Sequence, residues 1–329
     1  MSKISQKDIA NSLNISRVTV TKALMDHPDI AEKTRKLVKS RAMELGYIPD
    51  FIGRSLSSRK TQTIGLVIPK IAHSFFSYSV ERFYFYAKEQ GYHLIPMVSF
   101  EDAENERDNI QTLLSMRVDG LIIDIAENSI ENEGYEFAKK SGCKILFYDR
   151  YLIGSEDSYV TSNDYKSAKD LTEMAIKKGY KKIFHFAGPA QISIAFDRSQ
   201  GFKDGAKELT NARAIEVGMT YQSGFDQLMK LHTQKNLPDA IIAVNDSVAQ
   251  GVYDAAKKLG LAIPGDLGVA GFGDVETSKL LDPPLTSVQI PIDKMACEAV
   301  SIIVSMIESE KSPIKQKVFE STVIERESL

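Results

Sequence analysis

The sequence lacks the features that mark exported, membrane-spanning and metal-dependent proteins. Only two cysteines occur, Cys143 and Cys297, and no CxxC pair is present, so neither a disulfide framework nor a zinc site is expected. No apolar run approaches the roughly 18 residues that a membrane helix needs. The N-terminus MSKISQKDIAN has no apolar signal-peptide core. These absences predict a cytoplasmic protein without a bound metal or cofactor.

The patterns of common catalytic and nucleotide-binding sites are missing as well. No GxGxxG, GxxxxGK[ST] or HExxH occurs, and GFGD at 271–274 lacks the spacing that cradles a phosphate. The many Asp and Glu residues are not accompanied by a nucleophile–base set. An enzyme is therefore disfavoured and no catalytic residue is assigned. A stand-alone ligand-binding protein remains a further alternative.

Charge is divided unevenly along the chain. The 329 residues carry a net charge of −3, yet residues 1–60 hold twelve Lys/Arg against six Asp/Glu. The first 60 residues are thus net +6 and the remainder net −9. A small basic module joined to a larger acidic body is typical of a polyanion-binding head on a body that does not itself bind nucleic acid.

Two short helical patterns meet near residues 13–15. The first has its apolar residues Ile9, Ala10 and Leu13 on one face and opens with Ser5 and Asp8, which are spaced for a capping box. The second is predicted to turn four residues inward and five outward. The inward ones are Val18, Val20, Ala23 and Leu24, and the outward ones are Ser16, Arg17, Thr19, Thr21 and Lys22.

Hydroxyls and cations on an outer helix face suit the major groove of DNA, although a small helical bundle with a solvated face fits the same spacing. A third helix is predicted over 31–45 and stops at Gly46. Its expected apolar face consists of Leu37, Val38, Ala42 and Leu45.

Four segments resemble the lactose-repressor (LacI/GalR) family of bacterial transcription regulators. They are IxxxDIAxxLxIS at 4–16, VTVTKAL at 18–24, TRKLV at 34–38 and LGYIPD…GRSL at 45–56. The resemblance implies a nucleoid-associated homodimer, most often a repressor, whose two heads bind half-sites of a pseudo-palindromic double-stranded operator. The residues that it assigns to DNA contact in the head are Ser5, Ser16, Arg17, Val18, Thr19, Thr21 and Lys22.

The segment DFIGRSLSS at 50–58 has weak intrinsic helix character. By the resemblance it forms a hinge helix on DNA, where Leu56 wedges between base pairs in the minor groove and Arg54 contacts the backbone or groove. A plain Ser-rich linker is the alternative reading.

From residue 61 onward, apolar runs alternate with helical patterns twice over. Such alternation predicts two doubly wound parallel-sheet lobes, an arrangement that is periplasmic-binding-protein-like. The fold class is therefore an all-α helix-turn-helix head plus an α/β body. The expected domains are 1–49 (head), 50–60 (hinge) and 61–329 (body), with a first lobe of about 61–160 and 291–316 and a second of about 161–290 and 317–329. A single last strand is expected near 317–323.

Ligands of open α/β sheets bind beyond the carboxyl ends of the strands, where polar residues follow several apolar runs. Carboxylates with an Arg and an Asn, beside aromatic rings from Phe76 or Tyr221, suit vicinal sugar hydroxyls. By the resemblance most of the same positions bind a sugar effector. The predicted ligand-binding set is Ser74, Phe75, Asp124, Asp149, Arg198, Asn245 and Asp274. Helix capping is the alternative role for each acidic or amide residue, and the one favoured for Asp246.

The class of effector and the oligomeric state are expectations from the resemblance. A purine, a sugar phosphate or a phosphorylated carrier protein remains the alternative to a free sugar. Phe75, Val80, Phe83 and Tyr84 are candidates for a dimer surface, with a buried helix as the alternative. The sequence ends without a leucine heptad, so a dimer is expected and not a tetramer.

Overall fold

The computed structural model describes residues 4–48, 60–129, 133–309 and 312–329. The chain divides into two compact units, residues 1–61 and 62–329, which are described separately. No described helix is long and apolar enough to span a bilayer.

The described part of the first unit contains three helices, α1 (Gln6–Leu13), α2 (Arg17–Leu24) and α3 (Glu32–Glu44). The capping box is confirmed, since the Ser5 backbone N–H and hydroxyl both donate to the Asp8 carboxylate, at 2.8 and 2.7 Å. The turn between α1 and α2 is made by Asn14, whose φ of 54° is left-handed. The small core that joins the helices consists of Ile9, Ala10, Val20, Ala23, Val38 and Ala42.

Two inward assignments in this unit are wrong. Val18 is 66% exposed and Leu37 is 54% exposed. In an eight-residue helix with several apolar positions, only one stripe can face a core this small, and Val20 with Ala23 occupies it in α2. Val18 consequently lies on the outer face of α2, beside Arg17.

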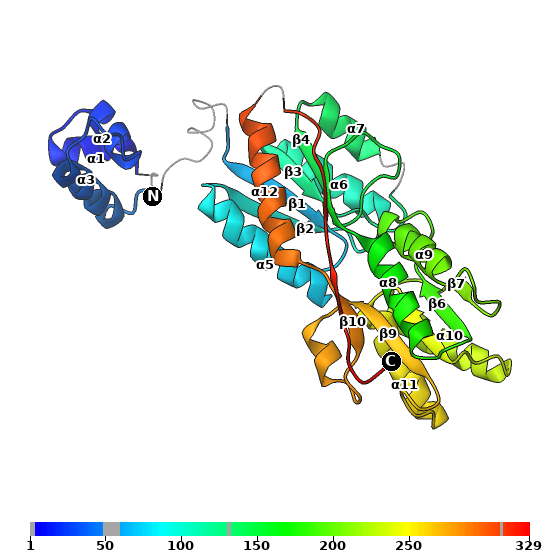
Figure 1. The fold of residues 1–329 in the computed structure, drawn as a ribbon. Helices are drawn as coiled ribbons and strands as arrows, with labels where there is room; N and C mark the ends of the chain where they lie inside the picture. The colour runs from blue at the N-terminus through cyan, green and yellow to red at the C-terminus, as the bar shows by residue number, and fades with distance from the viewer. Residues whose placement is uncertain (1–3, 49–59, 130–132, 310–311) are drawn as a thin grey trace. The chain divides into compact units, whose positions relative to one another are not determined.

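The first sheet of the body has the strand order β11-β5-β4-β3-β1-β2, and all its pairs are parallel. Helices α5 and α12 cover one face and α6 and α7 the other (Figure 1). The elements are β1 (Thr63–Ile68), α5 (Ser74–Glu89), β2 (His93–Val98), α6 (Ala103–Ser115), β3 (Gly120–Ile123), α7 (Glu133–Lys140), β4 (Lys144–Tyr148), β5 (Tyr159–Ser162), α12 (Ile292–Glu308) and β11 (Gln316–Phe319).

The second sheet repeats this plan with the order β12-β10-β9-β8-β6-β7, in which only β12 runs antiparallel. Helices α8 and α9 pack on one face and α10 and α11 on the other. The elements are α8 (Asp164–Lys177), β6 (Ile183–Ala187), α9 (Ser193–Gly205), β7 (Arg213–Glu216), α10 (Tyr221–Thr233), β8 (Ala240–Ala243), α11 (Asp246–Leu259), β9 (Gly268–Gly273), the 3-10 helix η1 (Glu276–Leu280), β10 (Thr286–Gln289) and β12 (Thr322–Ile324).

Alternating side chains of the central strands fill two cores per sheet. In β1, Ile64, Leu66 and Ile68 pack under α5 and α12, whereas Val67 packs under α6 and α7. Because both faces are covered, the strand is apolar throughout and fully buried. The expected doubly wound parallel architecture is confirmed, and it brings the carboxyl ends of the strands of each sheet to one edge.

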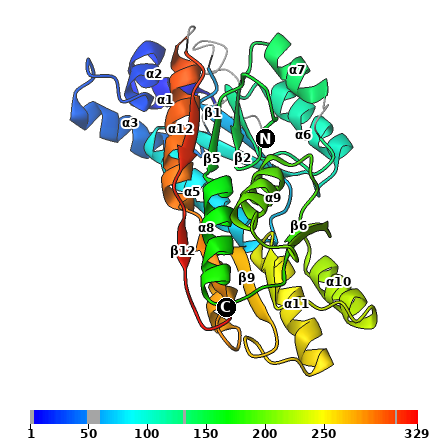
Figure 2. The ribbon, with the colours of Figure 1, turned by 45° about the vertical axis from the view of Figure 1, so that its right-hand side comes forward.

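The structure corrects several boundaries. The single strand expected near 317–323 is two strands, β11 in the first sheet and β12 in the second. On its way from the first sheet to the second, the C-terminal segment runs past α8 (Figure 2). The segment FDRSQGF predicts a helix that opens at Arg198, whereas α9 begins at Ser193 and contains Arg198 in its interior. The short strands β5 and β7 were not predicted, because four half-polar residues give little periodic signal.

One face of helix α5 is buried in the core of the body and is therefore not available as a dimer surface. Phe75, Val80 and Phe83 are all less than 10% exposed and pack beneath the first sheet, so their assignment to a dimer surface is wrong. Tyr84, at 47% exposed, remains on the outer side.

Gly201 allows α9 to approach α8 closely. A Cβ at this position would lie 2.1 Å from the Tyr165 backbone oxygen. Gly201→Ala should therefore force the helices apart and lower the free energy of unfolding by about 2 kcal/mol or more, which thermal unfolding would show as roughly 4–8 °C.

The matched control is Gly265→Ala, where the added Cβ would meet nothing nearer than 3.5 Å. Equal melting temperatures for the two variants would contradict the close-packing role of Gly201.

Candidate functional site

The outer face of α2 is polar except for one valine. Ser16 caps the helix by accepting the Thr19 backbone N–H at 3.0 Å, and its hydroxyl lies 2.8 Å from the Thr19 hydroxyl. Arg17 and Val18 in the first turn are exposed. The surface therefore offers a guanidinium for guanine and an apolar group for the thymine methyl.

The other predicted DNA contacts in the head are partly engaged with protein groups. The Thr21 hydroxyl donates to Gln6 Oε1 at 2.7 Å, which ties α2 to α1. Lys22 Nζ pairs with the Asp29 carboxylate at 2.7 Å, while Ser5 is exposed at the start of α1. Arg17 and Val18 are thus the freest groups on the face. Arg54 and Leu56 lie outside the described residues.

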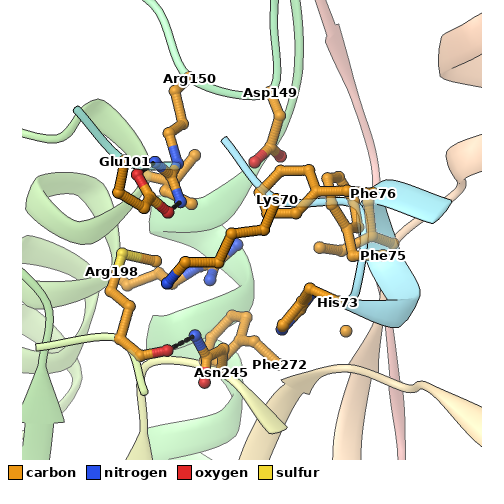
Figure 3. A pocket seen from close by; sticks show the side chains of 14 residues that line it. Lys70, His73, Phe75, Phe76, Glu101, Asp149, Arg150, Arg198, Asn245 and Phe272 are labelled. Carbon is orange, nitrogen blue, oxygen red and sulfur yellow. Dashed lines mark hydrogen bonds and ion pairs between the residues drawn. The ribbon is translucent and has the colours of Figure 1, made fainter. Parts of the chain in front are cut away.

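A pocket opens between the two sheets of the body, at the carboxyl ends of their strands (Figure 3). The first sheet and its loops contribute one wall, and the second sheet with α9 contributes the other. The lining residues are Lys70, His73, Phe75, Phe76, Glu101, Asp149, Arg150, Ile194, Arg198, Met219, Asn245, Phe272, Gly273 and Ile290. Four of the seven predicted ligand-binding residues are among them: Phe75, Asp149, Arg198 and Asn245.

Arg150 is held in the first wall by a bidentate ion pair. Its Nη1 and Nη2 donate to the Glu101 carboxylate at 2.8 and 3.1 Å, and Nη1 also donates to the Ile125 carbonyl at 2.9 Å. The guanidinium lies 5.6 Å from the centre of the Phe76 ring. Arg150 is only 2% exposed, so this pairing and the ring fix its position at the pocket.

Arg198 has the equivalent place in the second wall. Its Nε donates to Asp164 Oδ1 at 2.6 Å, Nη2 lies 2.6 Å from the same oxygen, and Nη1 donates to the Val244 carbonyl at 2.6 Å. The guanidinium stacks 4.6 Å from the Phe272 ring centre. These acceptors take three of five N–H groups, which leaves donors for a ligand.

Asp149 presents an unsatisfied carboxylate oxygen in the pocket. It follows β4 with a left-handed φ of 59°, is 3% exposed, and Oδ1 has no hydrogen-bond partner among the described residues. Burial raises the pKa of Asp149 to about 6, the Asp164 carboxylate adds to the rise, and Arg198 opposes it. A ligand hydroxyl is a suitable donor to this oxygen.

Asp124 lies behind the pocket and does not line it. It is fully buried, neither oxygen has a hydrogen-bond partner among the described residues, and Oδ1 is 3.7 Å from Arg150 Nε. Burial, followed by the Asp149 charge, raises the pKa of Asp124 well above its usual range. Its geometry therefore supports an indirect role, through Arg150 and Asp149.

Asp274 also does not line the pocket. Its carboxylate is already engaged with other side chains. Arg326 Nη2 lies 2.5 Å from Oδ1 and Gln289 Nε2 donates to Oδ2 at 3.1 Å. Asp246 is similarly engaged and accepts from Ser278, Ser287 and the Val275 backbone. Both acids organise the loop after β9.

Asn245 lines the pocket but also has a structural task. Its side-chain oxygen accepts the Val248 backbone N–H at 2.9 Å, which caps α11, and its amide donates to the Met219 carbonyl at 3.0 Å. Met219 lines the pocket, whereas Tyr221 does not: it is 40% exposed and its hydroxyl donates to Asp254. Ser74, the first residue of α5, is exposed and does not line the pocket.

The comparisons with known proteins cover both units. Residues 5–50 match the family described as "Bacterial regulatory proteins, lacI family", and residues 172–329 match "Periplasmic binding protein-like domain". The ribose operon repressor of Haemophilus influenzae is 28% identical over 99% of this chain and 98% of its own. The chain combines a lacI-family DNA-binding domain with a periplasmic-binding-protein-like domain.

Two solved structures extend the comparison. A lac repressor dimer bound to operator and the anti-inducer ONPF superposes with a TM-score of 0.88 at 21% identity, covering 99% of each chain. A periplasmic binding protein/LacI transcriptional regulator from Alkaliphilus metalliredigens, complexed with D-xylulofuranose, has a TM-score of 0.72 at 27% identity, covering 81% of this chain and 98% of its own. The protein is accordingly a DNA-binding transcription regulator, and the relatives named here are regulators and not enzymes.

Several residues that line the pocket were not among the predicted ligand-binding set. Glu101 and Arg150 were missed because the pairing that makes them part of the pocket joins residues far apart in sequence. Arg150 directly follows Asp149, so taking both residues after a strand would have found it. Lys70 and His73, which both follow β1, were also not in the predicted set.

The raised pKa of Asp149 makes stability depend on pH. Between about pH 4 and 6 the folded protein keeps a proton on Asp149 that the unfolded chain has lost, so stability falls as pH rises through this range. The total effect is on the order of 2–3 kcal/mol. Asp149→Asn, which cannot ionise, should remove this component and gain stability relative to the native protein as pH rises from 4 to 7.

Urea unfolding of both proteins at each pH measures the difference directly. A free-energy difference between them that stays constant from pH 4 to 7 would contradict the raised pKa of Asp149.

Proposed function

We propose that this regulator is a homodimeric repressor whose affinity for a pseudo-palindromic operator is controlled by a sugar bound between the two lobes of its body. The pocket itself carries the proposal: it is lined from both sheets, and it combines a free carboxylate oxygen, spare guanidinium donors and aromatic faces. Sugar hydroxyls donate and accept, and their ring faces are apolar.

The carboxylate, the guanidinium donors and the aromatic rings that would recognise a sugar come from both walls of the pocket. Asp149, from the first wall, would accept from one or more hydroxyls, and Arg198, from the second, would donate to neighbouring oxygens. Phe76 and Phe272 would pack on the ring from either side. The D-xylulofuranose complex of the Alkaliphilus relative and the name of the ribose operon repressor support a sugar as the effector.

A ligand held from both walls changes the equilibrium between lobe arrangements, since it favours the arrangement in which both walls reach it. Such a change would be passed to the operator-binding heads through the segment at 50–60, where we assign the minor-groove wedge to Leu56. We further infer that the dimer uses the outer side of α5, where Tyr78, Tyr84 and Phe85 are exposed.

The exposed pair Arg17 and Val18 should determine sequence preference. Arg17→Ala is expected to weaken operator binding by about 1–3 kcal/mol and to relax discrimination at one guanine position. Val18→Ala should weaken the preference for thymine at a neighbouring position. Competition binding with a set of single-base operator variants measures both effects.

Met43→Ala is the matched control, because Met43 is an equally apolar and 81% exposed residue on α3. If Arg17→Ala weakens binding to all DNA sequences equally, Arg17 contacts a phosphate and not a base.

The effector proposal is tested by operator titrations of the full chain with and without free sugars, purines and a phosphorylated carrier protein. One sugar class should shift operator affinity by about 5-fold or more, and Arg198→Met should lose the shift. A response to a purine or to the carrier protein alone would overturn the sugar assignment while leaving operator binding intact.

A further inference from the structure

Both arginines of the pocket are paired with a carboxylate, whereas Lys70 and Asp149 have no ion-pair partner among the described residues. Glu101 neutralises Arg150 and Asp164 neutralises Arg198, through contacts of 2.6–2.8 Å. Lys70, which also lines the pocket, has no carboxylate within ion-pair distance among the described residues. The pocket therefore contains a cation whose charge the surrounding protein leaves without a direct partner.

Lys70 is placed to meet a ligand and not merely solvent. It follows Pro69 at the carboxyl end of β1, is half-buried, and extends into the pocket in Figure 3. Its neighbour His73 is largely buried, with Nδ1 unpartnered among the described residues, and burial lowers the pKa of that imidazole to about 4. A neutral imidazole offers one donor or acceptor beside the lysine without competing for its charge.

The carboxylates of the pocket do not exclude an anion. Glu101 is held by Arg150 and also accepts the Glu127 backbone N–H at 3.0 Å, so its charge is already committed. Asp149 is next to Arg150 and Arg198, which counteract its charge. A ligand with hydroxyls near Asp149 and an acidic group near Lys70 would provide partners for both the free carboxylate oxygen and the unpaired ammonium group.

We propose that the effector is an anionic sugar, either a sugar carboxylate or a sugar phosphate, whose acidic group is bound by Lys70 with help from the spare donors of Arg198. The inference rests on the proposed control by a sugar and narrows it to one charge class. Charge-assisted hydrogen bonds to a half-buried ammonium group discriminate strongly against a neutral analogue.

Isothermal titration of the full chain with matched neutral and acidic probes tests the inference. The probes are D-glucose with D-gluconate, D-glucuronate and glucose 6-phosphate, and D-ribose with D-ribonate and ribose 5-phosphate. At least one acidic probe should bind about tenfold or more tightly than its neutral partner. The carboxylate and phosphate arms identify which acidic group is preferred.

Lys70→Met should abolish that preference while retaining the melting temperature, because Lys70 has no protein ion pair to lose. Lys207→Met, at an exposed lysine outside the pocket, should retain it. Added salt should weaken the acidic probe more than the neutral one.

Equal affinity for neutral and acidic probes, or an unchanged preference in Lys70→Met, would overturn the anionic class and leave control by a sugar standing. Failure of every probe to bind would overturn both.

Discussion

Two buried arginines, one in each wall of the body pocket, are the interaction on which the site depends. Arg150 and Arg198 are each almost fully buried, and each is neutralised by a carboxylate of its own wall, Glu101 and Asp164. An unpaired buried guanidinium would be costly, so these pairs must form with the fold. Because each pair forms within one wall, a change in the arrangement of the lobes would leave both pairs intact. Other interactions cross between the walls: the Arg198 charge acts on Asp149, and Tyr151 donates to Ser193 and Asp197.

The parallel sheets explain why these groups meet. In both sheets the strand order changes direction, between β1 and β3 and between β6 and β8, and the loops that follow the strands diverge there to leave a crevice. Lys70 and Asp149 follow strands of the first sheet, and Asn245 follows β8 of the second. Among the described residues of this crevice, the Lys70 ammonium group has no ion pair, and Asp149 Oδ1 and His73 Nδ1 have no hydrogen-bond partner. These groups are the basis on which we propose a ligand chemistry.

The architecture could be predicted well from the sequence, because hydrophobic periodicity and helix caps are local signals. Helix stops such as Gly46, the Ser5 and Asp8 cap and the apolar strands depend on residues only a few positions apart. The ion pairs formed by the candidate ligand-binding residues were less predictable. Asp274 looked available for a ligand, but Arg326, 52 residues away, occupies it. The outward turn of Val18 depends on which apolar stripe the neighbouring helices cover, and no window within α2 contains that information.

The central claim is that one ligand, bound by both walls, changes operator affinity. The most direct test measures the effector Kd with and without saturating operator, alongside the operator Kd with and without saturating effector. Linkage requires the two ratios to be equal. The account predicts a shared ratio of about 5-fold or more. A ratio of one in both titrations, with the effector demonstrably bound in the pocket, would contradict it.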